Sequence, residues 1–195
     1  MERKIKNIII CTLVVILVFM TVAYALLFQN LSINGTANIP RGSSTWNIYF
    51  DNLNLLNVSG TASIESGKNL QITGTTTLSG LTATLSAKGD SISYTFDIVN
   101  DGDINAKIGN ISLPNVNSAV TYAETSADEQ IVKPNIIYSL KYTSSGTDLS
   151  INDTLNAHTS VNVTFTVSYN SSASNIPNND VYLDDLIAEI DYIQS

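Results

Sequence analysis

A strict alternation of apolar and polar residues marks several segments of the chain, and it restricts the fold more than any other feature of the sequence. In the clearest segment, residues 91–98, isoleucine and aromatic side chains alternate with Ser, Thr and Asp. Residues 161–169 and 31–39 follow the same period of two. Successive side chains of a β-strand point to opposite faces of a sheet, so each segment has one face for a core and one for water. All three are predicted to be strands.

Weaker versions of this pattern predict further strands, which are separated by turn-forming residues. These strands are expected at residues 46–50, 70–77, 81–85, 104–111, 136–142 and 187–193. Clusters of Gly, Pro, Asn, Asp and Ser favour turns at 40–42, 66–69, 88–90, 100–103, 144–146 and 177–180. Eight or nine short strands at this spacing indicate an all-β fold, a single antiparallel β-sandwich of the jelly-roll kind. After Phe28, no helix beyond one short turn at 126–130 is expected.

The first 28 residues have a different character from the rest of the chain. Arg3, Lys4 and Lys6 precede an uncharged stretch that runs from residue 8 to residue 28. Positive charge before an apolar run holds the amino terminus in the cytoplasm and directs the following chain across the membrane. We therefore expect residues 1–28 to be a signal peptide or transmembrane anchor helix. Residues 29–195 are expected to form an exported β-sandwich domain at the cell surface or outside the cell.

Two fates remain open for this hydrophobic helix. Ala23 and Ala25 place small residues at the two positions that a signal peptidase recognises, which predicts cleavage after Ala25. The stretch 8–28 is also long enough, at 1.5 Å per helical residue, to cross a hydrocarbon layer of roughly 30 Å. An uncleaved anchor that holds the domain at the membrane is the alternative.

Net charge and the single cysteine exclude several kinds of protein. The chain has 9 Lys+Arg and 17 Asp+Glu, and removing Glu2, Arg3, Lys4 and Lys6 leaves 6 and 16, a net charge of about −10. This sign excludes nucleic acid as a partner bound through charge. Cys11 lies in the apolar run, so the exported part has no disulfide and depends on its core for stability.

The sequence lacks the residue sets on which most enzymes depend. His158 is the single histidine and precedes a predicted strand, and no Gly-x-Ser-x-Gly motif accompanies it. We interpret it as a turn or strand-edge residue. A zinc site would need several His or Cys ligands, and the exported part offers one His and no Cys. No catalytic residue and no cofactor are therefore expected, and the protein is predicted not to be an enzyme.

One turn carries a cluster of oxygen ligands. Asp101, Asp103 and Asn105 have the spacing with which a calcium-binding loop opens. The sixth position of such a loop lacks its glycine, and Lys107 lies on the next predicted strand. A hairpin turn without metal is the preferred interpretation, and these three residues are the weak calcium candidate.

Trp46 is the only tryptophan of the chain. It alternates with Ile48 and Phe50 and would share one face of a strand with them. We expect its indole to be buried in the core, where large apolar side chains contribute most.

Several short motifs resemble those of a known group of exported proteins. They are the end of the targeting segment at 21–25, Asn34-Gly35-Thr36-Ala37, the strand 46–50 and the terminal 190–194. In these, the chain resembles Gram-positive exported proteins with SipW-type signal peptides, which include the TasA and camelysin biofilm-fibre family. The resemblance implies a jelly-roll subunit on the cell surface. In some members a freed N-terminal strand inserts into the next subunit to build fibres. Camelysin-type members carry a metalloprotease label, for which this sequence has no zinc-ligand set.

The expected function is that of a non-enzymatic cell-surface or extracellular-matrix structural protein. Its expected partner is another copy of the same chain, and its N-terminal segment is expected to contact the membrane. The segment 31–39 is the candidate strand for assembly, because it could pair with a sheet edge in its own domain or in a neighbouring subunit. A surface module that binds a glycan or protein ligand is the alternative, with exposed tyrosines among the nine of the chain as its platform.

Overall fold

The computed structural model describes residues 17, 44–114, 126–176 and 181–195. The chain divides into two units, Met1–Gly42 and Ser43–Ser195. Of the first unit only Leu17, in a helical conformation, is described. Among the described residues, no helix has the length and apolar character needed to span a membrane. Apart from Leu17, four predictions lie outside the described residues: the helix 1–28, the cleavage site at Ala23 and Ala25, the boundary at 28/29 and the strand 31–39.

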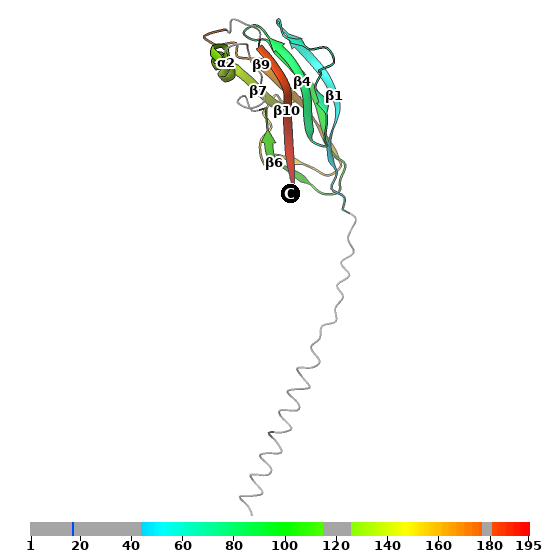
Figure 1. Cartoon of the computed structure of the whole chain (residues 1–195). Coiled ribbons are helices and arrows are strands. Elements are labelled where there is room, and N and C mark those ends of the chain that lie inside the picture. Colours follow the sequence, from blue (N-terminus) through cyan, green and yellow to red (C-terminus); the bar gives the residue numbers. More distant parts are fainter. Residues whose placement is uncertain (1–16, 18–43, 115–125, 177–180) are drawn as a thin grey trace, which may run out of the picture. The chain divides into compact units, whose positions relative to one another are not determined.

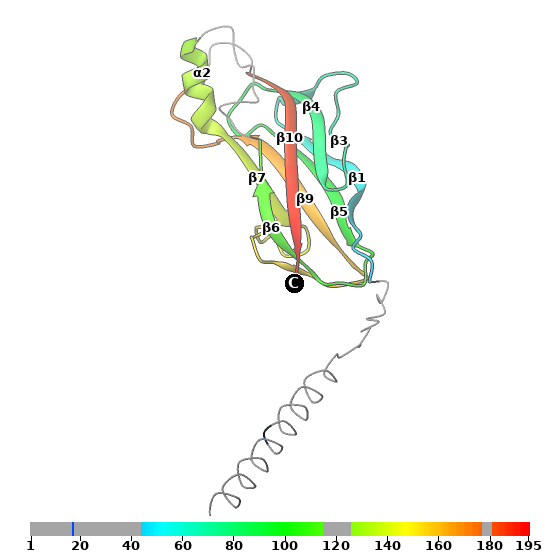
Figure 2. The same ribbon diagram turned by 60° about the horizontal axis from the view of Figure 1, so that its bottom comes forward.

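The second unit is an all-β sandwich of two antiparallel sheets, as the sequence predicts, and Figures 1 and 2 show the two layers. The four-stranded sheet has the order β1-β5-β9-β7. The six-stranded sheet has the order β2-β4-β10-β6-β8, and β3 also pairs with β4. In chain order the strands are β1 (Ile48–Ser59), β2 (Ser63–Ile64), β3 (Gln71–Ile72), β4 (Thr77–Leu85), β5 (Ser91–Asn100), β6 (Ala106–Ser112), β7 (Ile136–Tyr142), β8 (Thr154–Leu155), β9 (Thr159–Tyr169) and β10 (Val181–Gln194).

The core lies between the two sheets and is built from the alternating residues. In β5 every second side chain is buried, and the same holds for the second half of β9. Phe96 of β5 and Phe165 of β9 have no exposed surface, and Leu183 and Ile190 of β10, in the opposite sheet, belong to the same buried core cluster. Removing a buried phenylalanine side chain costs about 3–5 kcal/mol, so these strands supply much of the stability.

The strand predictions at 91–98, 161–169 and 136–142 are confirmed by β5, β9 and β7. Residues 70–77 do not form one strand, so that prediction is wrong. They contain the two-residue β3 and a turn, and Thr77 already begins β4, which folds back on β3 with Ile72 opposite Leu78. Gly74 in the middle of this segment favours the turn over a continuous strand.

The prediction for Trp46 is also wrong. β1 begins only at Ile48, and Trp46 is 40 % exposed, whereas Ile48 and Phe50 are buried as expected. The backbone on either side of Trp46 bonds to a turn outside the sheets: Asp101 donates to the Asn47 carbonyl and Asp103 donates to the Thr45 carbonyl. In this position the indole lacks the cover that the facing sheet gives to Phe50.

A short helix precedes β7. It is longer than the single turn that the sequence predicts: α2 spans Ser126–Val132, and a 3-10 turn, η1, spans Lys133–Asn135. Val132 is fully buried, and the Asn135 amide donates to the Ile131 carbonyl at 2.7 Å. These contacts anchor the end of α2 where the chain enters β7.

Candidate functional site

The candidate site lies at the outer edge of β1, the last strand of the four-stranded sheet. β1 pairs with β5 on one side, and none of the other strands within 44–114, 126–176 and 181–195 pairs with its opposite side. Near its start, the Phe50 amide donates to the Thr75 carbonyl at 2.7 Å. From Asn52 onward the edge has no comparable backbone partner among the described residues, so it is open to an additional strand.

The open part of β1 is apolar and uncharged. Residues 52–59 contain no Asp, Glu, Lys or Arg, although the chain carries a net charge of −8. Leu55 is 48 % exposed, Leu56 is 58 % exposed and Val58 is 38 % exposed. Natural proteins usually place charges, prolines or covering segments on such edges to prevent pairing with another chain. A long, neutral edge with exposed leucines is therefore the candidate interaction surface of the described domain.

Two irregularities in the register explain why leucines are exposed on this strand. Relative to β5, one extra residue lies between Asp51 and Asn54, and another lies between Leu55 and Asn57. Asn52, in the first irregularity, has a φ of 52°. Extra residues of this kind bend a strand and change the direction of its side chains. After Asp51, both faces of β1 are accordingly accessible.

The other long strands near sheet edges are covered over at least part of their length. β2 and β3 both pair with the outer side of β4. At the second half of β7, the Leu149 amide donates to the Leu140 carbonyl, and Lys141 forms an ion pair with Asp148 at 3.2 Å. Covering segments of this kind and edge charges both hinder strand addition, and residues 52–59 of β1 have neither among the described residues.

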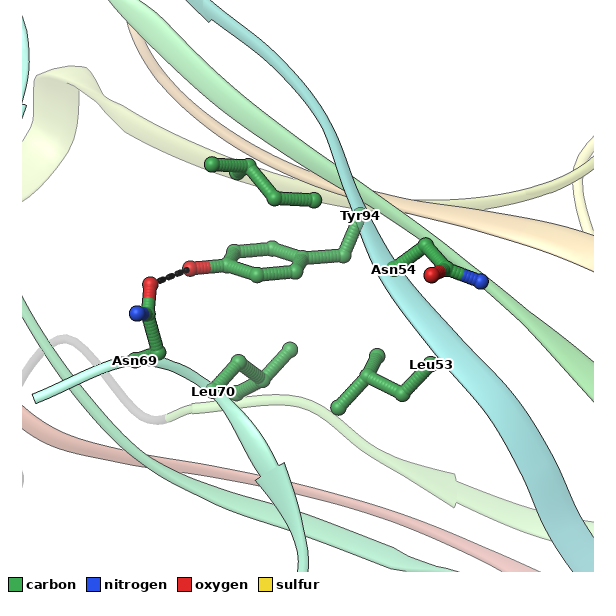
Figure 3. A pocket seen from close by; sticks show the side chains of 6 residues that line it. Leu53, Asn54, Asn69, Leu70 and Tyr94 are labelled. Atoms are coloured by element: carbon green, nitrogen blue, oxygen red, sulfur yellow. Dashed lines mark hydrogen bonds between the residues drawn. The ribbon is translucent and has the colours of Figure 1, made fainter.

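A cavity of about 260 Å³ opens beside the open half of β1. It is lined by residues of three segments, namely Leu53, Asn54, Leu55, Asn69, Leu70 and Tyr94. Figure 3 shows the Tyr94 ring extending across the site to Asn69, with Leu70 and Leu53 lying along one side of the ring. The Tyr94 hydroxyl donates a hydrogen bond to the Asn69 side-chain oxygen at 3.2 Å.

The residues that line the cavity carry no charge. Tyr94 is only 2 % exposed, and burial raises its pKa, an effect that the Leu70 backbone hydrogen bond partly offsets. The phenol is therefore uncharged at physiological pH and acts as a donor to Asn69. Leucine side chains provide apolar contact, and two amides provide polar groups at the rim. This combination fits an aliphatic side chain carried on a backbone segment.

The structure brings two of the sequence candidates together, His158 and Asp103. The His158 Nε2 lies 3.1 Å from Asp103 Oδ1, and both side chains are exposed. The other Asp103 oxygen accepts hydrogen bonds from the Thr45 amide and hydroxyl at 3.0 and 3.1 Å. These bonds, with the proximity of His158, hold the pKa of Asp103 below its ordinary value. Asp103 therefore fastens the segment before β1 to the turn after β5.

Asn105 and Asp101 have separate partners in the same turn. The Asn105 side-chain oxygen accepts a hydrogen bond from the Ala157 amide at 2.9 Å, and the Asp101 backbone amide donates to Asn47. Within the described part of the chain, no group of three or more His, Cys, Asp or Glu side chains could hold a metal ion. The oxygens of Asp103 and Asn105 serve as acceptors within the protein.

Comparison with known proteins finds no matching family model, no matching curated protein and no matching solved structure. The structure thus defines the class of the described domain, an antiparallel β-sandwich with an open apolar edge.

Sequence reasoning missed the edge of β1 and the cavity beside it. The apolar run Leu53-Asn54-Leu55-Leu56-Asn57-Val58, free of charge in an acidic chain, was the available signal for the edge. The cavity gave no such signal, because its residues come from parts of the chain that only folding brings together.

Proposed function

We propose that this protein is a non-enzymatic structural component of the cell surface or extracellular matrix. Residues 1–28 direct its export. The exported domain, a jelly-roll sandwich, assembles when a strand of another copy adds to the outer edge of β1. The single observation that supports assembly is that edge: residues 52–59 are uncharged, accessible on both faces and without a paired strand on the outer side among the described residues.

The segment 31–39 is the proposed donor. It alternates apolar and polar residues and contains no charged side chain, so it matches the chemistry of the β1 edge. Strand addition gains main-chain hydrogen bonds along its whole length and selects its partner by alternate side chains. The resemblance to fibre-forming exported proteins, stated above on short motifs, points in the same direction.

Removal of the donor tests this function. The chain beginning at Leu26 should form large assemblies in light scattering and electron microscopy. The chain beginning at Pro40 should stay monomeric and bind a peptide of residues 31–39. If the shorter chain assembles as readily as the longer one, the donor role is wrong. Amino-terminal sequencing of the protein from its native cells shows whether the mature chain begins at Leu26.

The alternative, glycan binding on a platform of tyrosines, has less support. The six tyrosines whose exposure is described are buried or half-buried, namely Tyr49, Tyr94, Tyr138, Tyr142, Tyr169 and Tyr192. Aromatic platforms need exposed ring faces. Binding of the Pro40–Ser195 chain to a glycan array, without assembly of the longer chain, would favour this alternative.

A further inference from the structure

Leu55 faces a core that is not closed at its position. It stands opposite Tyr94 in the register of β1 and β5, and opposite residues of antiparallel strands project to the same face of a sheet. Tyr94 is 2 % exposed, yet Leu55 is 48 % exposed. The facing layer at this edge consists of the two-residue strands β2 and β3 and the chain between them. The cavity is the space that this short cover leaves over Leu55.

We propose that the cavity beside β1 is a receptor for one aliphatic side chain of the incoming strand, supplied by residues 31–39 of a second copy of this chain; the proposal rests on the proposed function. The cavity holds about 260 Å³, and an apolar cavity of roughly 150 Å³ already accommodates benzene. Its leucines and the Tyr94 ring offer contact to a branched aliphatic group. Asn54 already donates to the Asn52 carbonyl and Asn69 already accepts from Tyr94, so the Asn54 oxygen and the Asn69 nitrogen are the polar atoms left for the backbone that carries this group.

The charge pattern identifies the occupant. Two copies with a net charge of −8 repel each other unless they meet through neutral surfaces. Both residues 52–59 and residues 31–39 lack charged side chains, and the two segments have similar length. On the apolar face of 31–39, Leu31, Ile33 and Ile39 are large enough for the cavity. One of these three side chains therefore fills the receptor, and it continues the core of the acceptor domain.

A pair of matched substitutions tests the receptor. In Leu55→Trp an indole occupies the mouth of the cavity, whereas Leu56→Trp adds the same bulk at a neighbouring exposed residue that does not line it. Each variant is made in the full chain, held in detergent micelles, and its self-association is measured by sedimentation velocity. Calorimetry then measures binding of the peptide 31–39 to the same variants of the chain beginning at Pro40, which lacks its own donor segment. A second pair, Leu55→Phe and Leu56→Phe, replaces any variant whose circular dichroism shows loss of fold.

The expected result is a loss of at least tenfold in both association and peptide affinity for the Leu55 variant, with less than a twofold change for the Leu56 variant. Single alanine substitutions of the peptide should show a tenfold or greater loss at one of Leu31, Ile33 and Ile39. Equal binding by wild type and both variants would overturn the receptor while leaving strand addition intact. If the wild-type chain neither associates nor binds the peptide, both the receptor and the proposed function are wrong.

Discussion

Replacing Asp90 by alanine should strongly destabilise the domain, because this buried carboxylate accepts several hydrogen bonds from two separate turns. Asp90 lies in the turn before β5 and is 1 % exposed. Its carboxylate accepts hydrogen bonds from the Thr61 amide at 2.9 Å, from the Thr61 hydroxyl at 2.8 Å, and from the Ser86 and Ala87 amides at 2.8 Å each. One side chain thus joins the turn after β1 to the turn after β4.

The expected magnitude follows from these four bonds. A hydrogen bond to a charged acceptor contributes about 1.5–3 kcal/mol, and a buried donor left without a partner costs about 1–3 kcal/mol. Asp90→Ala leaves three backbone amides without this acceptor, and water reaches the partly buried ones after some relaxation. The free energy of unfolding should fall by about 3–5 kcal/mol at pH 7.

The pH dependence gives a second measurement of the same carboxylate. Burial raises the pKa of Asp90, but the hydrogen bonds from Thr61, Ala87 and Ser86 together lower it by more, so the folded pKa lies below its ordinary value. A carboxyl group with a depressed folded pKa stabilises the protein above its unfolded pKa, and this contribution is lost as pH falls through the folded pKa. The difference between wild type and Asp90→Ala should therefore shrink in acid.

Urea unfolding of both proteins at pH 7 and pH 3, followed by circular dichroism, measures these values. Asp148→Ala is the control, because this carboxylate is 70 % exposed in its ion pair with Lys141, and exposed pairs contribute at most about 1 kcal/mol. A loss below 1 kcal/mol for Asp90→Ala at pH 7, or a difference that is unchanged in acid, would refute the reasoning.

Three further predictions concern the turns and the single indole. Gly60→Ala should lower the free energy of unfolding in urea more than Gly146→Ala does. Both glycines have φ near 70°, but a Cβ at Gly60 would overlap the Asp90 carboxylate, whereas Gly146 has open space around it. Equal losses of stability would contradict this. Trp46 should emit as a water-accessible indole and be quenched by iodide, since it is 40 % exposed; an unquenched, blue-shifted emission would contradict it. Added Ca²⁺ or EDTA should leave the melting temperature unchanged, because Asp103 is held by Thr45; a clear rise with Ca²⁺ would indicate a site.

The central strands could be predicted from the sequence because each has one solvent-exposed face and one buried face. In β5 the alternation extends over ten residues without interruption, and its pairing with β9 shifts nowhere. A continuous register keeps every second side chain in the core. The alternation of apolar and polar residues in the sequence therefore matches the alternation of buried and partly exposed side chains in the strand.

The outer strands deviated from the prediction because their register is interrupted. The sequence indicated only 187–193 for β10, yet the strand begins at Val181. Opposite β4, an extra residue separates Leu183 from Leu186, so both leucines are buried although they are three residues apart. Two buried residues that are three positions apart break the alternation of period two, so this pattern does not predict a strand there. The same reason hid the second half of β1, where two extra residues place apolar side chains on both faces.

The open edge and the missing cover of the core have one structural origin. On its outer side, β4 pairs with two short strands instead of one long strand, and the cavity lies between the chain that joins them and the far half of β1. Phe50 is buried, and its amide donates to the Thr75 carbonyl in the turn between β3 and β4, whereas Leu55 is 48 % exposed and lines the cavity. A sandwich that is closed near Phe50 and open at Leu55 can accept an extra strand there without breaking any existing pair. In the proposed assembly, the binding energy would come from completing a core, which would explain why this surface is apolar in an otherwise polar and acidic domain.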